Sequence, residues 1–167
     1  MNLFEAINAR QSVRAYQAKP VEQEKLEAVL KATNQAPSAG NLQAYQVYLV
    51  EEPSLKRGLA KAALDQSFVA QAPVVLVFCA VAARAGRYGR RGAELYCLQD
   101  ATAAVAYAQL AATALGLATC WVGAFDDGAV ARAGEGTPAR EHRAQHHGGD
   151  REAHHEQRAL GGRGPLD

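Results

Sequence analysis

The first 132 residues of this chain contain no histidine, and this absence removes a large class of functions. Without an imidazole the segment cannot build a Ser/His/Asp arrangement, which excludes most hydrolase mechanisms. A glycine-rich phosphate loop is also missing, since the sequence contains neither G-x-G-x-x-G after a strand nor G-x-x-x-x-G-K-[ST]. The three cysteines are widely spaced and form no C-x-x-C pair, so we interpret them as buried free thiols and predict no metal site.

The chain has no large excess of one charge sign, because its net charge is +1. It therefore has no overall field that attracts nucleic acid or an anionic membrane. Aromatic residues lie in apolar runs rather than between basic residues, residues 1–5 are not followed by an apolar signal region, and no stretch of uncharged apolar residues is long enough to span a membrane. We expect a cytoplasmic protein that binds neither nucleic acid nor membranes.

Large hydrophobic residues are distributed unevenly. Every Ile, Val, Phe, Tyr, Trp and Cys lies within residues 1–130, whereas residues 133–167 contain two leucines and all five histidines. We therefore predict one folded domain over residues 1–132 and a polar tail over 133–167, with no strand in residues 140–150. The abrupt change indicates a disordered extension or one translated in a shifted reading frame, and a weakly metal-binding His-rich tail is the alternative.

Periodicity in the first 130 residues predicts helices that separate strands. Helices are expected at residues 2–9, 20–36, 53–65 and 93–115, and strands at residues 45–50, 73–81 (buried on both faces) and 118–125. This order predicts an α+β fold of the three-layer α/β type, with a mixed central sheet covered by helices on both faces. The apolar helix at 93–115 is expected to be buried against a sheet or a partner subunit, and its many alanines permit the close helix approach that fits a dimer interface.

Two arginines and a hydroxyl occur within residues 10–14 (RQSVR). Arginine makes planar, charge-assisted hydrogen bonds to phosphate oxygens, and serine adds an O–H donor. In an extended segment the side chains of Arg10, Ser12 and Arg14 lie on one side. The pattern indicates a phosphate clamp, and a solvated basic turn after the first helix is the alternative.

A turn of small residues that carries two amides occupies residues 37–43 (PSAGNLQ), just before a predicted strand. The side chains of Asn41 and Gln43 offer donors and acceptors that suit the polar edge of a planar heterocycle such as a flavin. Ala39 and Gly40 allow the backbone to approach a ring closely. A helix stop followed by an ordinary turn is the alternative.

Three further features have two interpretations each. At residues 121–123 (WVG), a core tryptophan at a strand end competes with a turn whose backbone N–H reaches a cofactor. For Asp100, a cap, a helix partner or a solvent-facing carboxylate is favoured over a catalytic role. The basic, glycine-rich residues 84–92 are interpreted as a solvated mobile loop, with dinucleotide docking as the alternative.

Four segments, in this order and spacing, resemble the nitroreductase family of FMN-dependent oxidoreductases over about residues 2–127. They are residues 10–14 (RQSVR), 36–43 (APSAGNLQ), 72–75 (APVV) and 116–125 (GLATCWVGAF). The resemblance implies an obligate homodimer with FMN in two clefts at the interface. It also implies a ping-pong mechanism, in which NADH or NADPH gives a hydride to flavin N5 before a nitroaromatic, quinone or similar acceptor takes electrons from the same face.

The resemblance assigns residues to the cofactor but names no catalytic side chain, because the cofactor carries the chemistry. The arginine motif would hold the phosphate and ribityl end, and residues 37–39 of the partner subunit would pack on the ring. The implied cofactor-binding residues are Arg10, Gln11, Ser12, Arg14, Pro37, Ser38, Ala39, Asn41, Gln43, Gln66, Val122 and Gly123. Residues 133–167 lack the core strand and basic phosphate ligand of the family, so a truncated, non-catalytic member that binds FMN weakly or only dimerises is the second hypothesis.

Overall fold

The structure is a computed structural model that describes residues 1–134 and 140–142. Its helices are α1 (Leu3–Ala9), α2 (Gln23–Thr33), α3 (Pro53–Ala62), α4 (Phe68–Gln71), α5 (Gly89–Arg91), α6 (Cys97–Ala114) and α7 (Asp127–Gly134). Short helical turns are η1 (Ala39–Asn41), η2 (Ala82–Tyr88) and η3 (Gly92–Tyr96), and the strands are β1 (Tyr45–Val50), β2 (Val75–Ala80) and β3 (Arg140–His142). Each helix predicted from the sequence is present.

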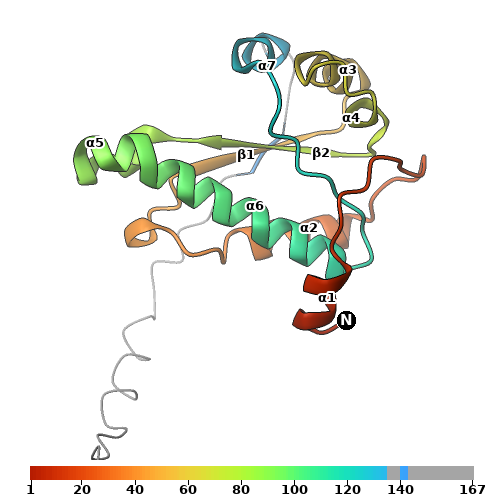
Figure 1. Cartoon of the computed structure of the whole chain (residues 1–167), viewed down its shortest axis with the longest axis horizontal. Helices are drawn as coiled ribbons and strands as arrows, with labels where there is room; N and C mark the ends of the chain where they lie inside the picture. Colours follow the sequence, from red (N-terminus) through yellow and green to blue (C-terminus); the bar gives the residue numbers. More distant parts are fainter. Residues whose placement is uncertain (135–139, 143–167) are drawn as a thin grey trace, which may run out of the picture.

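A three-stranded antiparallel sheet in the order β2-β1-β3 forms the middle layer of the molecule. The helices α3, α4 and α7 cover one face, and α2 and α6 cover the other (Figure 1). The predicted α+β fold with helices on both faces is therefore confirmed. The described strand pairs are antiparallel, and a single parallel bridge joins Ser12 to Thr119.

The core between the sheet and the α2–α6 layer forms because alternate residues of β1 face these helices. Tyr45, Val47 and Leu49 are buried there against one face of α2 and against Ala104 of α6. The small side chain of Ala104 allows α6 to lie close to the sheet. The opposite face of the sheet packs its valines against Leu55 and other apolar residues of α3, α4 and α7.

The strand β3 shows that the expectation of no strand in residues 140–150 is wrong for its first three residues. Backbone groups of Arg140–His142 pair antiparallel with β1, with Val47 opposite His142 and Leu49 opposite Arg140. Main-chain hydrogen bonding along an open strand edge does not require apolar side chains, so composition did not reveal it. The rest of the predicted tail, apart from Ala133 and Gly134 in α7, lies outside the described residues.

Three other predictions are corrected by the fold. The chain at residues 118–125 makes the bridge at Thr119 but no strand. The strand β2 is only half-buried, because it lies at one edge of the described sheet. Residues 84–92 are helical rather than a loop, and a Cβ on Gly92 would lie 2.1 Å from the carbonyl oxygen of Ala85, so glycine permits this tight packing.

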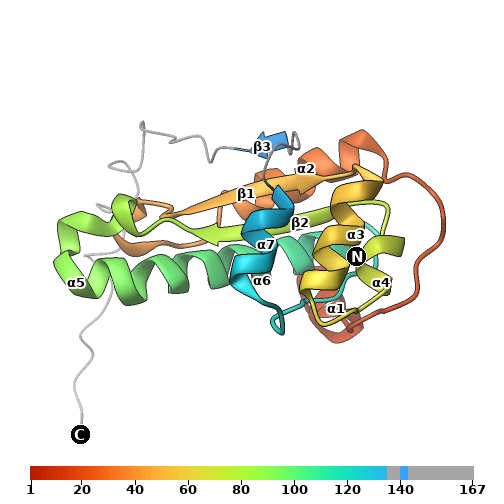
Figure 2. The ribbon, with the colours of Figure 1, turned by 90° about the horizontal axis from the view of Figure 1, so that it is seen from above.

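The long axis of the molecule follows α6. Figure 2 shows α5 at one end of this axis and α1 and α4 at the other. None of the described helices is both long and apolar enough to cross a membrane.

Candidate functional site

Residues from three separate segments meet near the C-terminal end of α6, and we call residues 10–14, 66–68 and 119–124 the clamp region. The chain leaves α1 in an extended conformation at Arg10, and the backbone N–H of Val13 donates to the carbonyl oxygen of Thr119 at 2.9 Å. Arg14 lies over the ring of Phe68, 6.0 Å from its centroid. The structure thus brings the arginine motif beside the segment that carries Val122 and Gly123.

Gln66 joins the segment that follows α3 to residues 119–124 of the clamp region. Its side-chain Nε2 donates to the carbonyl oxygens of Ala63 at 2.8 Å and Ala124 at 3.3 Å. The backbone N–H of Asp126 also donates to the carbonyl oxygen of Ala62 at 2.9 Å. Because these bonds fix the 122–124 segment against the end of α3, Gln66 lies with the other predicted residues of this region.

Within residues 1–134 the clamp region carries cations without acidic partners. Arg10 is half-buried and Arg14 is exposed, and among residues 1–134 neither forms an ion pair with a carboxylate. The side-chain oxygen of Thr119 is buried and has no hydrogen-bond partner in the described part of the chain. Burial raises the pKa of Tyr16, Cys120 raises it further, and Arg14 lowers it. Two guanidinium groups with no carboxylate partner in the described chain, together with the hydroxyls of Ser12 and Thr119, suit a phosphate ester.

The small-residue turn predicted at residues 37–43, which we call the amide loop together with Ala44, adopts left-handed backbone angles at three positions. The φ values are +55° at Gly40, +57° at Asn41 and +47° at Gln43. The left-handed φ of Gly40 favours glycine, and a Cβ there would also displace the ends of the Arg87 and Tyr88 side chains. Side-chain-bearing residues rarely adopt such angles, which means that surrounding contacts must hold the loop in this conformation.

The contacts of Gln43 show what its amide does in this chain. Its backbone N–H donates to the Ser38 hydroxyl at 3.0 Å, and its side-chain Nε2 donates to the carbonyl oxygen of Asn34 at 2.6 Å. The Gln43 side chain is buried, whereas Asn41 is exposed. Gln43 therefore shapes the loop, whereas the side chain of Asn41 lies on its exposed surface.

Two charged residues outside the predicted site hold the amide loop. The carboxylate of Asp100 on α6 accepts hydrogen bonds from the backbone N–H groups of Ala39 at 2.9 Å and Ala44 at 3.1 Å. Arg84 donates to the carbonyl oxygens of Gln43 and Tyr45 and, at 2.7 Å, to Oε1 of Gln46. The solvent-facing reading of Asp100 and the solvated-loop reading of Arg84 are both wrong.

The charges of Asp100 and Arg84 affect the pKa of Tyr45, the first residue of β1. Burial raises the pKa of Tyr45 to about 12, the negative charge of Asp100 adds to the increase, and Arg84 opposes it. The Tyr45 hydroxyl donates to the carbonyl oxygen of Thr33 at 3.1 Å. The strand start is thereby fixed to the end of α2, directly beyond the amide loop.

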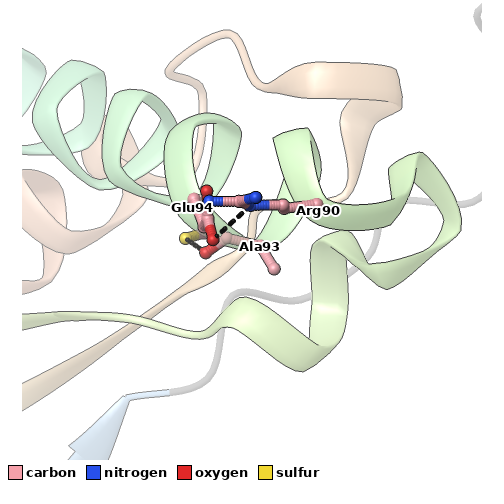
Figure 3. Close-up of polar contacts among 4 residues, drawn as sticks. Arg90, Ala93 and Glu94 are labelled. Atoms are coloured by element: carbon pink, nitrogen blue, oxygen red, sulfur yellow. Dashed lines mark hydrogen bonds and ion pairs between the residues drawn. The ribbon is translucent and has the colours of Figure 1, made fainter.

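The basic segment after β2 is largely occupied by local contacts. Figure 3 shows the ion pair between Arg90 and Glu94, whose Nε and Oε1 atoms are 2.8 Å apart, one helical turn from each other. Arg87 lies 4.9 Å from the ring centroid of Tyr88 and contacts the carbonyl oxygen of Gly40 at 3.4 Å. This segment therefore buttresses the amide loop from outside.

The clamp region and the amide loop lie at opposite ends of α6. Asp100, near the start of the helix, holds the amide loop, and Thr119, just beyond its end at Ala114, contacts the arginine motif. A helix rises 1.5 Å per residue, so roughly 20 Å separates the two regions along its axis. A single copy of the chain does not bring the two predicted halves of the site together.

Comparison with known proteins gives a consistent family. The model of the nitroreductase family matches residues 7–68 and 61–143. A protein of Thermus thermophilus named NADH dehydrogenase is 45% identical over 71 residues, which cover 42% of this chain and 35% of the relative. An FMN reductase [NAD(P)H] of Bacillus subtilis is 35% identical over 78 residues, covering 47% of this chain and 31% of the relative.

The fold is similar to solved structures as well. A nitroreductase family protein from Clostridium novyi NT superposes with a TM-score of 0.71 at 26% identity, covering 79% of this chain and 75% of that one. The matched segments span about a third of the length of the two curated relatives above.

Proposed function

The chain belongs to the nitroreductase family, and on this premise we propose that it is an FMN-dependent oxidoreductase. It passes electrons from NADH or NADPH to a small-molecule acceptor such as a nitroaromatic compound or a quinone. The observation that carries the proposal is the clamp region, where Arg10 and Arg14 have no carboxylate partner in the described chain and stand beside the Ser12–Thr119 bridge. Relatives named for FMN reduction and for NAD(P)H support the choice of cofactor and donor.

The site is proposed to form between two copies of the chain. A twofold axis places the amide loop of one copy against the clamp region of the other, which bridges the roughly 20 Å between the two regions within one copy. Apolar side chains are available for such an interface, because Leu3, Phe4 and Ile7 of α1 are 61%, 76% and 48% exposed. An exposed apolar group of this size on a small domain indicates a surface that is covered in an assembly.

Different residues would hold different parts of FMN. Arg10, Ser12 and Arg14 would hold the phosphate and the ribityl chain through charge-assisted hydrogen bonds. Residues 37–39 of the second copy would pack on the ring, with Asn41 at its polar edge, and Gln11, Gln66, Val122 and Gly123 complete the lining. When bound, FMN supplies hydride and electron transfer, while the protein supplies orientation and excludes water.

The donor and the acceptor are proposed to use one cleft in turn, which predicts ping-pong kinetics. No side chain of the described clamp region or amide loop is assigned to proton transfer. Their task is to fix the position of the ring so that either substrate can approach the same face. A cytoplasmic location remains a prediction.

A second candidate function is a non-catalytic family member that binds FMN weakly or only dimerises. The observation that favours it is that the family match ends at residue 143, so residues 144–167 carry no family segment. Such a protein would form the dimer but would not hold enough FMN for turnover.

The experiment is an FMN titration of the purified protein, followed by anaerobic addition of NADH or NADPH while flavin absorbance is recorded. We expect stoichiometric binding and bleaching of the flavin bands by at least one donor. Arg10→Ala and Arg14→Ala should each weaken FMN binding roughly ten- to a hundredfold, because each removes charge-assisted hydrogen bonds. The matched control is Arg57→Ala on the exposed part of α3. Protein that dimerises but takes up no FMN would support the second candidate instead.

A further inference from the structure

We propose that Asp100 is a positioning residue, which fixes the amide loop in its ligand-binding conformation by clamping both of its ends. The two carboxylate oxygens are divided between the two ends, with Oδ1 accepting from Ala39 at 2.9 Å and Oδ2 from Ala44 at 3.1 Å. Asp100 is separated from them by 61 and 56 residues in the sequence, so the bonds join the loop to a different layer of the fold. That the ligand is a flavin rests on the proposed function, whereas the clamping does not.

Burial makes both of these hydrogen bonds necessary. Asp100 is 3% exposed and Ala44 is not exposed at all, so water has little access to the Ala44 amide. A buried backbone N–H that loses its acceptor is strongly unfavourable, and here the side chain of Asp100 is the acceptor. Among the described residues no lysine, arginine or histidine forms an ion pair with Asp100, so the two amides are the groups that stabilise its charge.

Asp100 also encloses a stretch of backbone with left-handed angles. Gly40, Asn41 and Gln43, all between the two clamped amides, have positive φ. A loop with such angles relaxes toward other conformations unless its ends are held. The Ser38 hydroxyl closes the loop from within by accepting from Gln43, and Arg84 donates to the carbonyl oxygen of Gln43. Only Asp100 ties the start of the loop to a helix in the described contacts.

The consequence for binding follows from geometry. In the proposed dimer the amide loop approaches the clamp region of the second copy, so a loop free to change conformation must be ordered when the ligand binds. That ordering lowers affinity, and a loop already held in place avoids the cost. Asp100 therefore acts on binding without touching the ligand.

The test is Asp100→Asn in the full chain, with Asp127→Asn on the exposed start of α7 as the matched control. Asparagine keeps the volume but faces one of the two amides with an NH2 group, so one bond is lost. Hydrogen exchange, measured without FMN, should be at least tenfold faster at Ala39 or Ala44 and unchanged across β2. The FMN dissociation constant should also rise at least tenfold, and the control should change neither quantity.

Unchanged exchange at both amides in folded Asp100→Asn would overturn the proposal, and so would faster exchange with an unchanged FMN dissociation constant. If the variant does not fold, the native protein provides the test. There the Ala39 amide should exchange much more slowly than that of Gly40, for which the described contacts show no acceptor. Equal exchange rates at Ala39 and Gly40 would overturn the proposed role of Asp100. If native protein binds no FMN, the proposed function fails while the exchange result still decides the role of Asp100.

Discussion

Replacement of Tyr45 by phenylalanine is expected to destabilise the protein near neutral pH and to stabilise it in strong alkali. Tyr45 is 1% exposed, and its hydroxyl donates to the carbonyl oxygen of Thr33 at 3.1 Å. Loss of this buried hydrogen bond should lower the free energy of unfolding by about 1 kcal/mol. Phenylalanine keeps the aromatic ring, so no large cavity forms and the loss of unfolding free energy stays near this value.

The alkaline effect follows from the raised pKa of Tyr45, about 12 against a usual 10.0, which comes first from burial and then from Asp100. Above pH 10 the unfolded chain loses this proton while the folded chain keeps it. Stability from the neutral hydroxyl is therefore complete below pH 10 and is lost as the pH approaches 12. A difference of two pKa units corresponds to about 2.7 kcal/mol, so the stability curves of Tyr45→Phe and the native protein should cross near about pH 11.

The assay is urea unfolding followed by circular dichroism at several values from neutral pH to about pH 12. Tyr107→Phe is the matched control, because Tyr107 is 42% exposed on α6. Its curve should stay parallel to that of the native protein at every pH. If the Tyr45→Phe curve also stays parallel and never crosses, the surroundings of Tyr45 do not hold its hydroxyl neutral, and the start of β1 is not buried beside Asp100.

Three further predictions concern the core, the amide loop and a thiol. Leu49→Ala should lower the free energy of unfolding by about 2–5 kcal/mol, whereas the exposed Leu64→Ala should change it by less than about 0.5 kcal/mol, as measured by urea unfolding. Gly40→Ala should weaken FMN binding in a titration, because alanine is strained at a φ of +55° and its Cβ would displace the Arg87 and Tyr88 side chains from the loop. Gly86→Ala has nothing within 4 Å of its Cβ and should leave FMN binding unchanged. Burial raises the pKa of the Cys79 thiol, so iodoacetamide should label it more slowly in folded than in urea-unfolded protein, as mass spectrometry can follow; equal rates would contradict this.

Local sequence patterns were sufficient for much of the fold. The apolar spacing of α2 and the aromatic and β-branched residues of β1 each predicted their element, because side-chain pattern reports on which face is buried. Proline at the first turn of α3 marked its start correctly. The family resemblance also came from local motifs, and the family match confirms it.

Long-range contacts account for what the sequence did not reveal. The strand β3 is defined by backbone pairing with β1, which leaves no trace in side-chain composition. The role of Asp100 depends on bonds across about 60 residues, and Arg84 likewise acts on a loop distant in sequence. A single charged residue in an apolar helix was the available signal for Asp100, since a buried carboxylate needs donors and the nearby turn could supply them.

The most direct test of the proposed composite site mixes two inactive variants. Arg10→Ala/Arg14→Ala breaks the clamp region, and Gly40→Val breaks the amide loop, so neither variant alone should bind FMN. When the two are co-expressed, half of the dimers should contain one chain of each kind, with one intact site of two, and the mixture should recover about a quarter of native FMN binding. Recovery at that level supports a site shared between two copies. No recovery, in a mixture shown to contain mixed dimers, would contradict it.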